Sequence, residues 1–291
     1  MERIEKAPAK INLSLDALFR HSDDGRHEWE MVMTSVDLAD YVHLKLTAAP
    51  AIEVRTDSGF LPEDQRNLAY QAARTLQKKF NIAGGVQIAI TKHIPVAAGL
   101  GGGSADAAAV LRGLNQLWHL DLSLAELAEI GLTIDSDVPY CVYSRTALVT
   151  GKGDQIRPLG ELPPFWVVLA KPRISVSTPS VLNHLSYRDL NQHPDTRAVI
   201  AGIKAHSFDQ MCAGMGNVLE EVTARRYPEI THLKRQMLKF GADAAQMSGS
   251  GPTVFGLCRK YSRAQHICNS LHGFCKEVYL VQPCELNKKA S

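Results

Sequence analysis

Hydrophobic and polar residues alternate near the start of the chain, as they do in a strand with one buried face. Ile11, Leu13, Leu15 and Ala17 take every second position of residues 10–18, and this period of two predicts a β-strand. Segments rich in β-branched residues also favour strands. Further strands are expected at 29–36, 41–47, 51–56, 85–91, 146–150, 154–159, 166–172 and in the terminal segment EVYLVQP.

Other segments repeat their apolar residues every three to four positions, which is the spacing of an amphipathic helix. This period predicts a helix over 67–80, and a second is expected from Ser104 to about Trp118. A third begins at Ser123, where Glu126 three residues later completes a capping box. Further helices are expected near 179–186, 195–205, 216–226, 229–240 and 262–272.

The order of these elements predicts the fold class and a division into two domains. Strands and helices are mixed without strict alternation, which favours an α+β fold over a doubly wound parallel sheet. A chain of 291 residues is long enough for two domains. Because Pro163-Pro164 breaks regular structure, we expect one domain over 1–162 and a second over 163–291.

Composition excludes several functional classes. The 32 basic and 30 acidic residues give a net charge of only +2, and they are mixed along the chain, so neither nucleic acid nor a membrane surface is an expected partner. The amino-terminal segment reads as a strand, not a targeting peptide, and the six cysteines form no CxxC pair. We therefore expect reduced thiols and a cytoplasmic protein. Oligomeric state stays open between monomer and homodimer.

The segment PVAAGLGGGSADAAA at residues 95–109 carries the clearest chemical signal. Gly99, Gly101, Gly102 and Gly103 remove side chains where backbone N–H groups could approach a ligand. The helix that follows adds unpaired N–H groups and a partial positive charge, which together favour an anion. Ser104 could be the helix N-cap, or could turn its hydroxyl to a phosphate or to Mg²⁺. The segment therefore predicts a phosphate loop.

Three other interpretations of the loop can be weighed. A Walker A loop needs a lysine after its glycines, and none follows here. A dinucleotide fingerprint needs an acidic residue about 20 positions further on, but Asp121 stands beside a helix cap and not at a strand end. A glycine-rich connector without a ligand is the remaining alternative. Nucleoside triphosphate binding is the prediction that fits best.

Several motifs, taken together and in order, resemble those of the GHMP kinases. Any one glycine loop would be weak evidence, whereas an ordered set over nearly 250 residues is specific. Within the family, the chain is most similar to members that phosphorylate a hydroxyl of a polyol linked to cytidine diphosphate, in the non-mevalonate route to isoprenoids. Three motifs carry the resemblance: the first is KAPAKINLSL (6–15), the second is PVAAGLGGGSADAAA (95–109) and the third is MSGSGPTVF (247–255). Two further segments lie between them, DDGRHEWEMVMTSVDLAD (23–40) and DSDVPYCVY (135–143).

The resemblance implies a fold, cofactors and roles for individual residues. It implies an amino-terminal domain like that of ribosomal protein S5, a ferredoxin-like carboxyl-terminal domain, ATP with Mg²⁺, and a small-molecule substrate. Asp137 would be the catalytic aspartate and Lys10 its partner, with Ser104 as a ligand of Mg²⁺. The implied ATP-binding residues are Pro95, Ala97, Gly99, Leu100, Gly101, Gly102, Gly103, Ser104, Asn67 and Lys92. The implied substrate-binding residues are Asn12, Arg26, His27, Thr178, Leu182, Ser248, Gly249 and Ser250.

Some of these residues have simpler interpretations, and some depart from the family pattern. Asn67 could be only a helix cap, His27 a structural histidine, and the SGSGP turn a plain connection between strands. Arg26 and Leu182 stand where aromatic residues usually enclose the cytosine ring, and Asp135 replaces a common glycine. The alternatives are therefore a GHMP kinase of another alcohol or phosphate, or a catalytically silent nucleotide-binding relative. Retention of Lys10 and Asp137 disfavours the silent relative.

Overall fold

The computed structural model describes residues 1–188, 190 and 192–286, and it divides into two compact units. Neither unit is continuous in the sequence. The first unit comprises Met1–Ala9, Leu38–Val96 and Gly101–Ser144, and the second comprises Lys10–Asp37, Ala97–Leu100 and Arg145–Ser291. The boundary predicted between residues 162 and 163 falls inside the second unit. As a boundary between family domains it stays a prediction.

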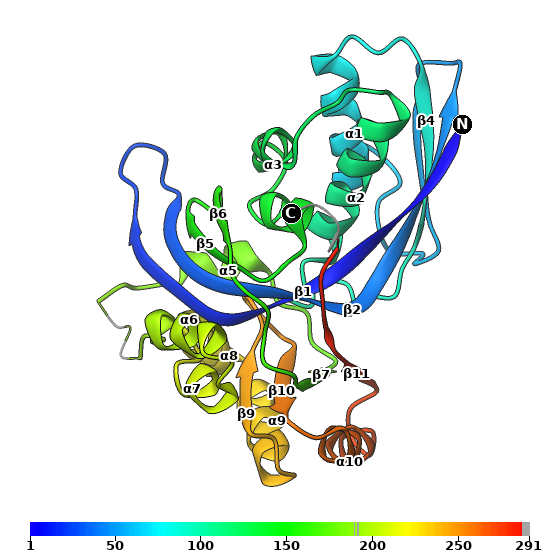
Figure 1. The fold of residues 1–291 in the computed structure, drawn as a ribbon. Helices are drawn as coiled ribbons and strands as arrows, with labels where there is room; N and C mark the ends of the chain where they lie inside the picture. Colours follow the sequence, from blue (N-terminus) through cyan, green and yellow to red (C-terminus); the bar gives the residue numbers. More distant parts are fainter. Residues whose placement is uncertain (189, 191, 287–291) are drawn as a thin grey trace. The chain divides into compact units, whose positions relative to one another are not determined.

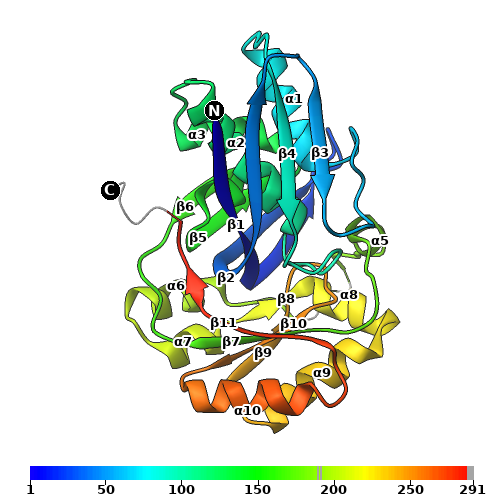
Figure 2. The same ribbon diagram turned by 90° about the vertical axis from the view of Figure 1, so that its right-hand side faces the viewer.

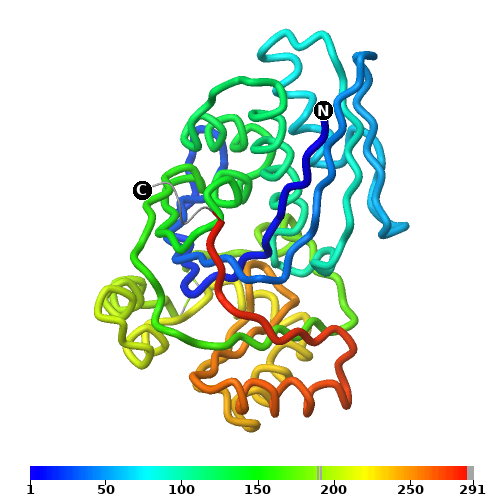
Figure 3. Tube along the Cα trace, turned by 45° about the vertical axis from the view of Figure 1, so that its right-hand side comes forward, coloured from blue at the N-terminus to red at the C-terminus, as the bar shows by residue number. Residues whose placement is uncertain are grey.

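Two long strands pass through both units, and Figures 1 and 3 show them running side by side from the amino terminus. They are β1 (Glu2–Arg20) and β2 (His27–Thr47). The sequence predicted a break between 36 and 41, but β2 is continuous there. Asp40, a polar residue within the predicted break, is buried and accepts hydrogen bonds from the N–H groups of His93 and Ile94. The eight-stranded sheet built on these strands has the order β3-β4-β2-β1-β8, with β5 and β12 also paired to β2 and β6 to β5.

The first unit places helices on one face of its part of this sheet. Strand β4 (Gly85–Thr91) pairs antiparallel with β2 and parallel with β3 (Ile52–Thr56). Helices α1 (Leu68–Lys79) and α2 (Gly102–Leu117) cover these strands, as Figure 2 shows. Small residues let α2 pack closely on β2. At Gly113, for example, a Cβ would lie only 2.3 Å from the Leu44 side chain. The remaining helices of this unit are α3 (Leu124–Leu132) and α4 (Val138–Tyr143).

The second unit contains a four-stranded antiparallel sheet with the order β11-β7-β10-β9. Numbered along the chain, these strands stand in the order 4-1-3-2. Helix α9 precedes β9 and α10 joins β10 to β11, which gives the β-α-β-β-α-β pattern of ferredoxin-like folds. The ferredoxin-like expectation is therefore confirmed. The bounds are β7 Trp166–Lys171, α9 Pro228–Lys239, β9 Ala244–Met247, β10 Val254–Cys258, α10 Tyr261–Leu271 and β11 Glu277–Val281.

Most predicted elements are present, and the mixed α+β class is confirmed. The capping box is formed, because the Ser123 hydroxyl accepts from the Glu126 N–H and the Glu126 carboxylate accepts from the Ser123 N–H. Among the described residues, no helix combines the length and the apolar character that crossing a membrane requires. The remaining elements are β5 Ala147–Gly151, β6 Gln155–Pro158, α5 Thr178–Asn183, α6 Thr196–Lys204, α7 Phe208–Ala213, β8 Gly216–Asn217, α8 Val218–Arg226 and β12 Pro283–Cys284.

Candidate active site

The predicted phosphate loop leads into α2 as expected, but the helix begins earlier than predicted. Its first residue is Gly102 and its N-cap is Gly101, whose φ of 69° lies in the left-handed region that favours glycine. The prediction that Ser104 could be the N-cap is wrong, since Ser104 lies in the first helical turn. No side chain caps this helix. Its first-turn N–H groups therefore suit an anion.

The Ser104 side chain is buried and bonded to a carboxylate of the same unit. Its hydroxyl donates to Oδ1 of Asp135 over 2.8 Å, and the same oxygen accepts the backbone N–H of Asp137 over 3.1 Å. Asp135 thus connects the first turn of α2 to the residue predicted to be the catalytic aspartate. The sequence had marked Asp135 only as a departure from the family pattern.

Asp137 is the N-cap residue of the short helix α4, but its carboxylate makes no capping hydrogen bond to that helix. The backbone holds the residue instead, because its carbonyl accepts the N–H of Cys141 over 3.0 Å and its N–H is bound by Asp135. Its side chain is therefore not needed to start the helix. Lys10 belongs to the second unit, so the pairing of Asp137 with Lys10 stays a prediction.

In the second unit, the first and third motifs meet at Asn12. Lys10, which is 4% exposed, donates from Nζ to Oδ1 of Asn12 over 3.0 Å. That oxygen also accepts the N–H of Gly249 over 3.1 Å, and the Asn12 amide nitrogen lies 3.5 Å from Sδ of Met31. The fully buried Asn12 therefore fixes the ammonium of Lys10. Its predicted contact with substrate stays a prediction.

Residues 97–100 of the phosphate loop pack on the third motif within the same unit. The Ser248 hydroxyl donates to the carbonyl of Gly99 over 3.0 Å, the N–H of Thr253 donates to Ala98, and the N–H of Lys10 donates to Leu100. Gly99 has a φ of 74°, and a Cβ there would lie 2.3 Å from the carbonyl oxygen of Ser248. The third motif is thus more than a plain turn, because it supports the phosphate loop.

Asn217, which was not predicted from the sequence, holds the main chain of the third motif. Its amide nitrogen donates to the carbonyls of Met247 and Gly249, each over 2.8 Å, while its oxygen caps α8. An asparagine at the expected start of a helix was the only signal. A second contact joins two predicted substrate residues, since the hydroxyls of Thr178 and Ser250 lie 2.7 Å apart.

His27 is joined to a second residue that the sequence analysis missed, Tyr187. Nδ1 of His27 lies 2.5 Å from the Tyr187 hydroxyl, and the His27 ring centroid is 5.3 Å from that of Trp29. Burial, followed by the positive charge of Arg20, lowers the pKa of His27, so the ring is neutral near pH 7. Arg26 is exposed and its N–H is bound by Asp24, and Leu182 is half-buried on α5.

The two residues predicted on the adenosine side, Asn67 and Lys92, both bind other side chains or main-chain groups of the first unit. Asn67 caps α1 with its oxygen and donates from its nitrogen to the carbonyl of Pro62, so it is a helix cap, and whether it is only that stays open. Lys92 lies between two buried carboxylates, those of Asp40 and Asp106. Burial raises the pKa of Asp106 to about 8 even beside this lysine. The contact of either residue with adenosine stays a prediction.

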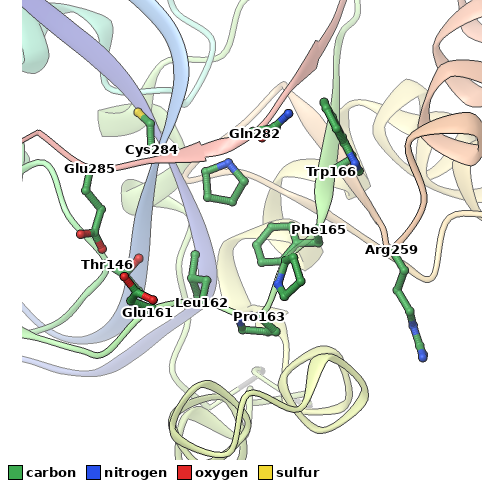
Figure 4. A pocket seen from close by; sticks show the side chains of 12 residues that line it. Thr146, Glu161, Leu162, Pro163, Phe165, Trp166, Arg259, Gln282, Cys284 and Glu285 are labelled. Atoms are coloured by element: carbon green, nitrogen blue, oxygen red, sulfur yellow. The ribbon is translucent and has the colours of Figure 1, made fainter. Parts of the chain in front are cut away.

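A cavity of about 420 Å³ lies elsewhere in the second unit and contains none of the predicted site residues. Figure 4 shows Phe165, Trp166 and Pro163 along it. Arg259, also shown there, is paired with Asp209 and Asp243. No predicted chemistry maps to this cavity, which leaves the glycine motifs and their neighbours as the candidate site.

The sequence matches two family models in the expected order. The description "GHMP kinases N terminal domain" covers residues 67–145, and "GHMP kinases C terminal" covers residues 199–277. The first match contains the phosphate loop and Asp137, and the second contains the third motif, at 247–255. Both predicted glycine motifs therefore lie inside the matched regions.

Curated relatives and a solved structure resemble nearly the whole chain. The 4-diphosphocytidyl-2-C-methyl-D-erythritol kinase of Latilactobacillus sakei is 65% identical over 283 residues, which cover 97% of this chain and 99% of that protein. The protein of the same name from Lactiplantibacillus plantarum is 63% identical over 288 residues, or 99% of this chain and all of that protein. A crystal structure titled 4-(cytidine 5'-diphospho)-2C-methyl-D-erythritol kinase matches with a TM-score of 0.80 and 31% identity, over 97% of this chain and 99% of that one.

A more distant structure shows that the fold itself is shared more widely. The Leishmania major mevalonate kinase superposes with a TM-score of 0.76 at 15% identity, over 97% of this chain and 96% of that one. At that identity the likeness shows the fold alone. Sequence and structure agree, and the chain belongs to the GHMP kinase family, in the branch of the 4-diphosphocytidyl-2-C-methyl-D-erythritol kinases.

Proposed function

We propose that this protein transfers the γ-phosphoryl group of ATP to the 2-hydroxyl of 4-diphosphocytidyl-2-C-methyl-D-erythritol in the cytoplasm. The observation that carries the proposal is the identity above 60% to kinases of that name over almost the entire chain. The arrangement of the glycine motifs supports it, because an uncapped helix start and a buried lysine can position phosphates and neutralise their charge, as phosphoryl transfer needs. A silent nucleotide-binding relative would need neither Lys10 nor Asp137.

Each motif has a role in this reaction. The N–H groups at the start of α2 hold the phosphates of ATP, and the helix dipole favours their charge. Asp137 accepts or orients the proton of the substrate hydroxyl. Lys10, held by Asn12, places a positive charge beside the group that is transferred. Most of the catalysis then comes from positioning and from neutralisation of charge.

The donor set at the start of α2 fits Mg²⁺. This ion prefers oxygen ligands and takes only a few from protein beside those of the nucleotide. Ser104 offers a hydroxyl oxygen whose lone pairs are left for a cation, because its hydrogen is donated to Asp135 over 2.8 Å. Ser104 is the residue that would hold it. When bound with ATP, the ion neutralises charge on the phosphates.

The proposed reaction is tested by the choice of acceptor. Release of ADP, coupled to detection of the phosphorylated product, should occur with 4-diphosphocytidyl-2-C-methyl-D-erythritol and not with homoserine or mevalonate. Activity on one of the other alcohols alone would favour a different GHMP kinase. No activity on any acceptor, with ATP still bound, would favour the silent relative.

We place the cytosine end of the substrate at His27 and Tyr187. Their rings lie 6.1 Å apart between centroids and are joined by a hydrogen bond. Bases stack best on aromatic faces. The guanidinium of Arg26 can stack on a base, but Leu182 offers only apolar contact, whereas Tyr187 is aromatic and lies beside His27, a residue predicted in the substrate site. Tyr187 therefore takes over the stacking that the sequence alone left without an aromatic partner.

Replacing Tyr187 should weaken the binding of the cytidine substrate but not the binding of ATP. Stacking on an aromatic ring is worth about 1–3 kcal/mol, so Tyr187→Ala should raise KM for the cytidine substrate by about 5- to 150-fold and leave KM for ATP unchanged. Tyr187→Phe keeps the ring and loses the bond to His27, and serves as the matched control with a smaller effect. Equal KM values for Tyr187→Ala and the parent protein would remove Tyr187 from the site.

A further inference from the structure

The hydroxyl of Ser104 has one hydrogen, and the acceptor beside it is a carboxylate oxygen of Asp135. Ser104 is 6% exposed, and its hydroxyl donates to Oδ1 of Asp135 over 2.8 Å. In this contact the hydroxyl is the donor and the carboxylate oxygen the acceptor, so the single hydrogen of Ser104 is already used. The Ser104 oxygen can then offer only lone pairs to a ligand. Lone pairs suit a cation and do not suit a phosphate oxygen, which itself needs a donor.

Asp135 is well placed to impose this orientation. Its own N–H donates to the carbonyl of Gly131 and its carbonyl accepts the N–H of Val138, each over 3.2 Å. Its Oδ1 also accepts the N–H of Asp137 over 3.1 Å. One carboxylate oxygen thus binds both the first turn of α2 and the main chain of the proposed catalytic residue.

We propose that Asp135 is a positioning residue that turns the oxygen of Ser104 towards the cation of the bound nucleotide. The same carboxylate holds the main chain of Asp137 through its N–H. The inference rests on the proposed function and deepens it, because it names the group that makes Ser104 a metal ligand. Hydrogen-bond partners behind metal ligands orient them, and their loss costs about 10- to 100-fold in metal affinity or activity. Asp135 itself need not touch the ion.

The test measures nucleotide binding by calorimetry, without turnover. Kd for ADP is determined with Mg²⁺ and with EDTA, for the parent protein and for Asp135→Ala, Asp135→Asn and Ser104→Ala. Asp135→Ala should lose about 10- to 100-fold of the Mg²⁺-dependent gain in affinity, with its Kd in EDTA unchanged. Asp135→Asn should keep most of the gain, because an amide oxygen can accept both hydrogen bonds. Ser104→Ala should lose as much of the Mg²⁺-dependent gain as Asp135→Ala. The double variant Ser104→Ala with Asp135→Ala should lose no more of that gain than either single variant.

Three results would overturn the proposal. If Mg²⁺ increased the ADP affinity of Asp135→Ala as much as that of the parent protein, Ser104 would need no carboxylate to orient it. A loss in Asp135→Asn as large as that in Asp135→Ala would show that the charge matters, which makes Asp135 a direct ligand. If Ser104→Ala kept the full Mg²⁺-dependent increase in ADP affinity, the Ser104 hydroxyl would not be a metal ligand. This variant decides the question if Asp135→Ala does not fold. Failure of the proposed function appears separately, as absent turnover on the cytidine substrate with the binding pattern intact.

Discussion

Replacing Asp137 by asparagine is expected to lower kcat by about 10²- to 10⁴-fold, the usual contribution of a general base, while the protein still folds and binds ATP. The shape of the side chain is kept and its charge is removed. Local structure should survive, because Asp137 is held through its backbone by Asp135 and Cys141 and makes no side-chain cap to α4. Steady-state kinetics with a thermal melt and an ADP titration measure all three properties.

The matched control is Glu129→Gln, which removes an exposed carboxylate from α3 in the same unit. Its kcat should equal that of the parent protein. A kcat of parental size in Asp137→Asn would contradict the assignment of Asp137, whatever the melting temperature. A loss of folding in Asp137→Asn would contradict the account of how the backbone holds this residue.

Replacing Gly99 by alanine is expected to damage both stability and ATP binding. Its φ of 74° is unfavourable for alanine by about 1–2 kcal/mol. The new methyl group would also lie 2.3 Å from the Ser248 carbonyl and 2.9 Å from that of Gly251, and overpacking of this kind costs about 1–3 kcal/mol more. Relief of the clash requires the phosphate loop to separate from the third motif, so the affinity for ATP should fall as well.

Gly59 offers a control for the backbone contribution alone. Its φ is 64°, and a Cβ there would meet no atom within 4 Å. Gly59→Ala should therefore show only the cost of the left-handed conformation, about 1–2 kcal/mol by denaturant unfolding, with ATP affinity unchanged. Equal destabilisation in the two variants would mean that residues 97–100 do not pack on the third motif as the structure shows.

The sequence predicted the elements whose patterns are long and the motifs that meet at the site. The capping box at Ser123 and Glu126 is local, so four residues were enough to identify it. Helices α4 and α7 were not predicted: each has six residues, too few turns to show a clear period, although α5, which is equally short, was expected near 179–186. The start of α2 was misplaced because Ser104 is a strong N-cap candidate, yet Gly101 adopts the left-handed conformation that begins the helix.

Contacts between residues distant in sequence were beyond what one sequence can show. Tyr187 lies 160 positions from His27, and no local pattern connects them. Asn12 was expected to face the substrate, whereas the structure shows its oxygen shared between Lys10 and Gly249. Asp135 was noted only for what it replaces, because its bond to Ser104 depends on how α2 and α4 pack. Residue identity suggested the chemistry, and tertiary packing decided which partner each group has.

The path of the chain also constrains how this protein can evolve. The backbone passes from one unit to the other after residues 9, 37, 96, 100 and 144. A crossover near residue 162 between two relatives would therefore not exchange a whole unit. It would join Lys10–Leu15 of one parent to Gln246–Ser250 of the other, although Asn12 and Gly249 are bonded and Gln246 donates to the main chain of Asn12. We therefore expect the first and third motifs to be inherited as a matched pair, because a substitution in either one changes contacts with residues more than 200 positions away.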